Sequence, residues 1–219
     1  MKYLLTVVVY ILTIFLIPVP VSAQDGFRPS LIAMGSGESP VSNGLSATLQ
    51  AENQRKRMIE VTLQEEQAWV MYGPKFKTGR LEGLVAGSAG HFQGAPWAGP
   101  YLNAKFRLTE VAGQKVSVGT LQWPAFFIGR EPNNWKNDGT KNLDTILVGH
   151  LSSFNLSVGP VSLEYSILNF LDDPLNHLPG ASFTQKVWKD FAITASGTYN
   201  TNAEKPMFFI GGAWKIERK

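Results

Sequence analysis

A histidine, a serine and a glutamate stand close together in the stretch GHLSSFNLSVGPVSLEYS. His150 precedes Ser152 by two residues, and Glu164 follows the serine by twelve. A serine nucleophile, a histidine base and a carboxylate that orients the histidine are the groups that acyl transfer needs. If the strands on either side of Val158-Gly159-Pro160 pair across a three-residue corner, all three side chains can lie on one face of a hairpin. The stretch therefore predicts a candidate catalytic site. The alternation of polar and apolar residues places its side chains on the polar face, which we expect to line the inside of a barrel.

The rest of the sequence offers little other chemistry. His91 and His177 fall in expected turns, where a solvated histidine is the simplest interpretation. No group of His, Cys, Asp and Glu has the spacing of metal ligands, no GxSxG elbow occurs, and the glycine-rich stretches lack the order of a phosphate loop. We therefore expect no cofactor and no metal site.

The amino-terminal segment MKYLLTVVVYILTIFLIPVPVSAQ has one basic residue, Lys2, then a long apolar run and the small-residue ending Val21-Ser22-Ala23. These are the parts of a secretory signal peptide. We expect residues 1–23 to be cleaved and the mature chain to be exported; a retained anchor is the alternative, because the run is nearly long enough to span a bilayer. Residues 24–44 are rich in Gly, Ser and Pro and are predicted to be a flexible lead-in or a short plug.

Composition narrows the class of protein. The 219 residues carry a formal charge of only +3 and no long basic run, so nothing indicates a nucleic-acid partner. There is no cysteine, so an exported chain must rely on packing and strand pairing instead of disulfides. Many glycines and aromatic residues with modest hydropathy favour a β-rich envelope protein.

From Leu45 onward the chain reads as extended runs with a two-residue period, separated by turns. Residues 45–217 are predicted to form one antiparallel up-and-down transmembrane β-barrel of eight to ten strands, an all-β fold. The expected runs are Leu45 to Glu52, Met58 to Tyr72, Arg80 to Ala89, Tyr101 to Val111, Lys115 to Phe127, Leu143 to Leu156, Val161 to Phe170, Val187 to Asn200 and Met207 to Ile216. Tight turns follow the fourth and sixth runs, whereas the long polar segments Gly129 to Asn142 and Leu171 to Gly180 follow the fifth and seventh. Short turns at one rim and long loops at the other are typical of outer-membrane barrels.

Alternation does not by itself say which face of such a barrel meets water. The apolar set includes many small residues that would leave voids in a soluble core but that fluid lipid can cover: Ala47, Ala51, Gly83, Gly87, Ala89, Ala195 and Gly197. Aromatic residues near run ends are predicted to form girdles at the two membrane interfaces: Trp97, Tyr101, Trp123, Phe126, Phe127, Phe170, Trp188, Tyr199 and Phe208. We therefore expect the apolar faces, such as that of Phe191, Ile193 and Tyr199, to contact lipid.

With its signal peptide, absence of cysteine and alternating runs up to the ending FFIGGAWKIERK, the chain resembles small bacterial outer-membrane β-barrel proteins. The resemblance implies localisation in the outer membrane with lipid as a partner. The His-x-Ser order with a later Glu also looks like the outer-membrane lipid A deacylase family. That likeness implies His150 as base, Ser152 as nucleophile and Glu164 as orienting acid.

Charged residues expected inside the barrel suggest a different use. Lys105, Arg107, Asp144 and Lys215, together with His150 and Glu164, would form a lumenal polar network, since buried charges need partners. A dense network would make a plug or an anchor, and a gap in it would make a pore. The favoured function is porin-like passage of small solutes, or a structural or surface-binding role, without enzymatic activity. The alternatives are an acyl hydrolase acting on lipid A and a soluble periplasmic, lipocalin-like barrel that binds an apolar ligand.

Overall fold

A computed structural model describes residues 28–38, 43–64, 67–92, 94–127, 147–170 and 175–214. The expected signal peptide and two of the expected network residues, Asp144 and Lys215, lie outside these ranges. Within them, no helix is long and apolar enough to cross a membrane.

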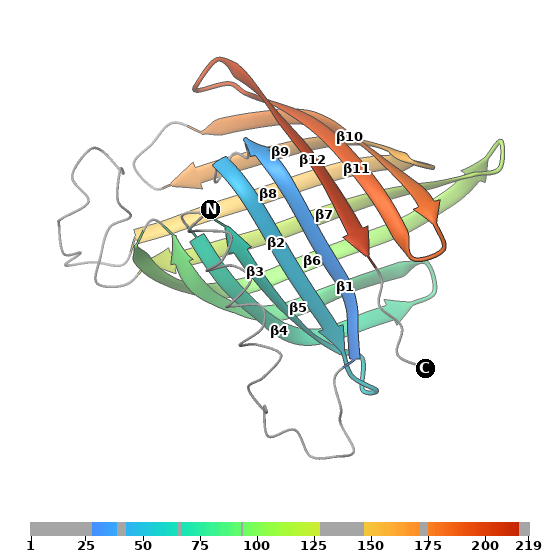
Figure 1. Ribbon diagram of the computed structural model, residues 1–219, viewed down its shortest axis with the longest axis horizontal. Coiled ribbons are helices and arrows are strands. Elements are labelled where there is room, and N and C mark those ends of the chain that lie inside the picture. Colours follow the sequence, from blue (N-terminus) through green and yellow to red (C-terminus); the bar gives the residue numbers. More distant parts are fainter. Residues whose placement is uncertain are drawn as a thin grey trace.

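The described residues form a closed antiparallel barrel in which each strand pairs with its neighbours in sequence and β1 pairs with β12. The strands are β1 (Arg28–Glu38), β2 (Asn43–Glu52), β3 (Arg57–Gln64), β4 (Gln67–Thr78), β5 (Leu81–Phe92), β6 (Ala95–Val111), β7 (Gln114–Phe127), β8 (Leu147–Val158), β9 (Val161–Phe170), β10 (Asn176–Trp188), β11 (Phe191–Asn200) and β12 (Lys205–Trp214). Figure 1 shows them tilted around one common lumen. The predicted all-β, up-and-down barrel is confirmed.

The predicted count of eight to ten strands is wrong, because the barrel has twelve. One expected run, Met58 to Tyr72, contains both β3 and β4. Two strands were not expected at all: β10, which starts within the presumed polar loop, and β1, which lies in the presumed lead-in. The segment 28–38 is therefore a strand whose backbone pairs with β2 and β12 and closes the barrel. The Gly and Ser residues of this segment favoured a flexible lead-in over a strand. The segment can still form a strand, because strand pairing uses main-chain groups and not side chains.

The two faces of the wall are cleanly separated. On β11, Phe191, Ile193 and Tyr199 lie on the outer face, and Thr194, Ser196 and Thr198 lie on the lumenal face. Large apolar side chains on the outer face stay uncovered: Phe154 is 53% exposed, Leu163 57%, Ile210 64% and Phe208 65%. A soluble lipocalin-like barrel would need these side chains inside. The small residues Ala47, Gly83, Gly87, Ala195 and Gly197 also fall on the outer face, as predicted.

The ends of the barrel differ. One end, here the tight-turn rim, carries the short connections after β2, β4, β6, β8 and β10. The other, the long-loop rim, carries the connections after β1, β3, β5, β7, β9 and β11, including the segments that follow Phe127 and Phe170. The β6–β7 hairpin extends beyond its neighbours at the tight-turn rim (Figure 1). The predicted placement of both long segments at one rim is confirmed.

Candidate functional site in the barrel lumen

Two unlike walls line the lumen. The lumenal side chains of β3 to β7 include large rings and thioethers, and we call them the aromatic wall: Met58, Trp69, Met71, Leu84, Phe92, Trp97, Tyr101, Trp123 and Phe127. The lumenal side chains of β8 to β11 are mostly small and polar, and we call them the polar wall: Ser153, Asn155, Ser162, Glu164, Ser166, Ser182, Thr184, Thr194, Ser196 and Thr198. Bulk is therefore concentrated on one side of the barrel.

Trp123 is the centre of the aromatic wall. Its ring centroid lies 5.3 Å from that of Trp69, 5.4 Å from that of Trp97 and 5.6 Å from that of Tyr101, with the planes in edge-to-face arrangements. The Trp123 indole N–H donates to Ser88 Oγ at 2.9 Å, and that hydroxyl donates to the Gly99 carbonyl at 2.7 Å. Edge-to-face contact and a hydrogen-bonded indole hold the rings in fixed orientations.

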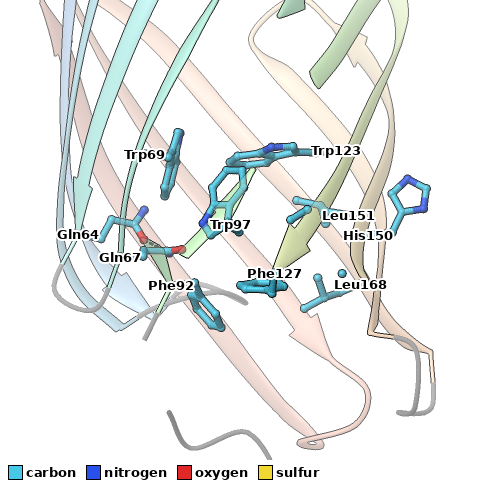
Figure 2. Close-up of a pocket in the computed structure, with 12 residues that line it drawn as sticks. Gln64, Gln67, Trp69, Phe92, Trp97, Trp123, Phe127, His150, Leu151 and Leu168 are labelled. Atoms are coloured by element: carbon cyan, nitrogen blue, oxygen red, sulfur yellow. Dashed lines mark hydrogen bonds between the residues drawn. The ribbon is translucent and has the colours of Figure 1, made fainter. Parts of the chain in front are cut away.

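Two cavities of the lumen lie on either side of this ring cluster. The smaller, about 220 Å³, lies toward the long-loop rim. Its lining is mostly aromatic and includes two amides, Gln64 and Gln67, which hydrogen-bond to each other. Figure 2 shows these glutamines beside Trp69 and Trp97. The larger cavity, about 830 Å³, lies toward the tight-turn rim and is lined by charged side chains of both signs as well as by Tyr101 and Asn103.

Ion pairs lie at the tight-turn end of the lumen. Lys75 Nζ is 2.6 Å from a Glu52 carboxylate oxygen, and Arg107 is 2.7 Å from Glu82. Lys105 shares the lumenal face and is the strand partner of Glu82. The register thus places Lys105 and Arg107 on the lumenal face, beside Glu82. The acidic partners Glu52 and Glu82 were not predicted, although each lies on the polar side of an alternating run.

Glu164 belongs to the polar wall. Its carboxylate accepts hydrogen bonds from Ser153 Oγ at 2.8 Å and Ser166 Oγ at 2.9 Å, and the two hydroxyl oxygens lie 3.0 Å apart. This network leaves the carboxylate exposed to the lumen. It is a satisfied anionic group on the wall, surrounded by hydroxyls.

The predicted shared face of His150, Ser152 and Glu164 is wrong. Val158 pairs with Val161 across a two-residue turn, so Glu164 lies opposite Asn155, and His150 and Ser152 point outward. The turn fits two residues because Gly159, with φ +56°, supplies the left-handed conformation that its first position needs. A one-residue change of register moves every side chain of a strand to the other face.

His150 and Ser152 do contact each other on the outer face. Ser152 Oγ lies 3.2 Å from His150 Nε2, and Gln122 Oε1 accepts from Ser152 at 2.8 Å while lying 3.1 Å from the same histidine nitrogen. Figure 2 shows the His150 ring turned away from the lumenal rings. Gln122 thus contacts both members of the pair through one amide oxygen, on the histidine nitrogen that faces the serine. Within the described ranges, no three His, Cys, Asp or Glu side chains are grouped to hold a metal ion.

Several rings predicted for the membrane girdles face the lumen. Trp97, at 7% exposure, Tyr101, Trp123 and Phe127 are buried or half-buried inside the barrel. Phe126, Trp188, Tyr199 and Phe208 are exposed on the outside, as predicted. The alternation along the strand could have separated the lumenal rings from the outer ones. Trp97 and Tyr101 are an even number of residues from Lys105, which was assigned to the lumen, so they lie on the same face.

Comparison with known proteins supports the fold. No family model matches the chain, and no curated protein matches it by sequence. Solved structures do match. One is the KdgM porin in complex with disordered oligogalacturonate, with a TM-score of 0.57 at 10% sequence identity. The match covers 87% of this chain and 100% of the porin chain. The NanC porin matches with TM-score 0.58 at 10% identity over 85% of this chain and all of its own. The chain has the transmembrane β-barrel fold of outer-membrane porins.

Proposed function

We propose that the protein is an outer-membrane channel through which small hydrophilic solutes pass. The observation that carries this proposal is the polar wall. A barrel of about 8 strands is just filled by its own side chains, whereas one of about 16–18 leaves an aqueous channel. A twelve-stranded barrel lies between these sizes. Whether it conducts then depends on the size of its lumenal side chains, and a wall of serines and threonines leaves room along β8 to β11.

The outer surface supports membrane insertion. Uncovered apolar side chains such as Phe154 and Ile210 are unfavourable in water and are stabilised by lipid tails. The solved neighbours named above are porins, and the KdgM porin structure includes an oligogalacturonate. Both facts agree with a channel in the outer membrane.

The experiment is single-channel recording of the purified protein in planar lipid bilayers. Ser182 lies in the polar wall, paired with Ser162 and Ser196, while its neighbour Ala181 points to the outside. We expect Ser182→Trp to lower the conductance severalfold and Ala181→Trp to leave it unchanged. Absence of conductance above protein-free bilayers, or recovery of the protein from the soluble periplasm without detergent, would overturn the proposal.

A second candidate function, acyl hydrolysis at the lipid-facing surface, is favoured by one contact. Ser152 Oγ and His150 Nε2 are 3.2 Å apart on the outer face, where an acyl chain would lie. Glu164, on the lumenal face, cannot orient the histidine, and Gln122 Oε1 contacts the same Nε2 that faces Ser152, so it competes for the serine hydroxyl instead of holding the other ring nitrogen. If this candidate holds, Ser152→Ala abolishes lipid deacylation without altering conductance or the heat-dependent mobility of the folded barrel. Equal lipid profiles from cells carrying the wild type and the variant would dismiss it.

A further inference from the structure

The smaller lumenal cavity has a lining unlike that of any other described part of the lumen. It combines the rings of Trp69, Trp97, Trp123 and Phe127 with the amides of Gln64 and Gln67. Among the residues that the structure describes, none that lines this cavity has a carboxylate, ammonium or guanidinium group. His150 also contributes to the lining, but its ring is directed away from the cavity and hydrogen-bonds on the outer face (Figure 2). The cavity is therefore neutral, whereas the larger one is charged.

The rings are already in place. Trp97 and Phe127 pack with Ala95 in a buried cluster, and Trp123 is held by the contacts with Trp69 and Ser88 described above. Groups held in the binding geometry lose little conformational freedom when a ligand arrives, so more of the contact energy contributes to affinity. Mostly apolar concave sites with a few polar groups are the usual form of small-molecule sites.

We propose that this cavity is a subsite for the ring of a neutral sugar. The inference rests on the proposed channel function and deepens it. A solute that crosses a water-filled lumen must carry many polar groups, yet these walls offer aromatic faces. A hexose ring meets both requirements, because its C–H groups give it apolar faces and its hydroxyls surround the edge. Rings can stack against those faces, and the glutamine amides, which both donate and accept, can bind the hydroxyls.

The absence of charge in the lining argues for a neutral sugar over an acidic one. Moving a carboxylate out of water into a site without a cation carries a desolvation cost that nothing there offsets. Charged partners such as Lys75 and Glu52 are found in the other cavity, where they already pair with each other. The order of sites along the lumen is thus a neutral aromatic site near the long-loop rim and a charged site near the tight-turn rim.

The test measures block of the channel current by a linear glucose oligomer and by a galacturonate oligomer of the same length. We expect the glucose oligomer to block at the lower concentration. Trp97→Ala should raise its half-blocking concentration about tenfold, in keeping with the loss of one aromatic contact. Gln67→Ala should raise it less, and Ala181→Ser, on the outer face, should leave it unchanged. Heat-dependent gel mobility identifies variants that have folded.

The outcomes separate this inference from the channel proposal. A conducting channel that the glucose oligomer does not block, that the galacturonate oligomer blocks better, or whose block survives both Trp97→Ala and Gln67→Ala would overturn the sugar subsite and leave the channel standing. If the protein does not conduct, titration of its tryptophan fluorescence in detergent with the glucose oligomer still decides: a saturable change lost in Gln67→Ala supports the subsite, and no change overturns it.

Discussion

Ala195 and Ser196 make a matched pair for asking which face of the barrel meets lipid. They are adjacent small residues in the middle of β11. Ala195 lies on the outer face between Phe183 and Ile210, which are 46% and 64% exposed. Ser196 lies on the lumenal face between Ser182 and Phe209. Replacing each by arginine introduces the same charge and nearly the same volume on opposite sides of one wall.

The expected effects differ because of the medium that each arginine meets. At the middle of a bilayer, an arginine on the lipid face of a barrel lowers the free energy of unfolding by about 2–4 kcal/mol. We expect Ala195→Arg to lose stability within this range. Ser196→Arg can extend into the lumen, where it keeps its hydration, so its stability should change by less than about 0.5 kcal/mol. The cost of Ser196→Arg should appear as a reduced conductance instead.

The assay is guanidinium unfolding of the protein folded into phospholipid vesicles, followed by tryptophan fluorescence, with gel mobility before and after heating as a check on folding. Single-channel recording on the same samples provides the second readout. If Ser196→Arg proves the more destabilising substitution and Ala195→Arg is tolerated, the barrel is apolar inside in its working environment. The assignment of faces, and with it the channel, would then be refuted.

Three further predictions, one of them with a matched control substitution, test separate parts of the structure. Gly73→Ala should lower the free energy of unfolding by about 1–3 kcal/mol, because the added Cβ would lie 1.9 Å from the Val85 carbonyl oxygen. The control is Gly87→Ala, whose Cβ would meet nothing within 4 Å. This control should be neutral or stabilising in the same unfolding assay. Lys75→Met should leave Glu52 without its cation and shift the reversal potential in a salt gradient toward cation preference, while changing stability by no more than about 1 kcal/mol because the pair is partly solvated. Gly159→Ala should destabilise the β8–β9 hairpin by about 1 kcal/mol, measured by unfolding, because its φ of +56° is unfavourable for a residue with a Cβ.

Alternation in the sequence was sufficient to predict the faces of most strands. On β6, alternation in the sequence separates Leu102 and Phe106 from Asn103 and Lys105, and on β9 it separates Leu163 from Ser162 and Glu164, in agreement with the register. Strong two-residue periods resist error because a shifted register would turn a whole apolar face from lipid into the lumen. The fold class followed from such strands.

The candidate catalytic site could not be predicted so well, because it depended on one turn. The sequence around Gly159 is compatible with a two- or a three-residue connection, and the choice moves Ser152 from one face to the other relative to Glu164. β8 gives weak guidance here, since its middle contains polar residues on both faces. β10 was missed because of its local sequence. It begins with a polar segment that contains Pro179, and a proline within a run usually argues against a strand.

The rings of the lumen show where aromatic content misleads. Trp97, Tyr101 and Trp123 were assigned to the membrane interfaces because they lie near run ends, but the register places their side chains on the lumenal face of β6 and β7. A ring inside a barrel this size has a different consequence from a ring at its surface. It narrows the lumen from one side only, and the opposite polar wall keeps space for water. In the proposed channel, conduction and recognition therefore belong to different walls: side chains of β8 to β11 would set how much passes, and side chains of β3 to β7 would set what is bound on the way.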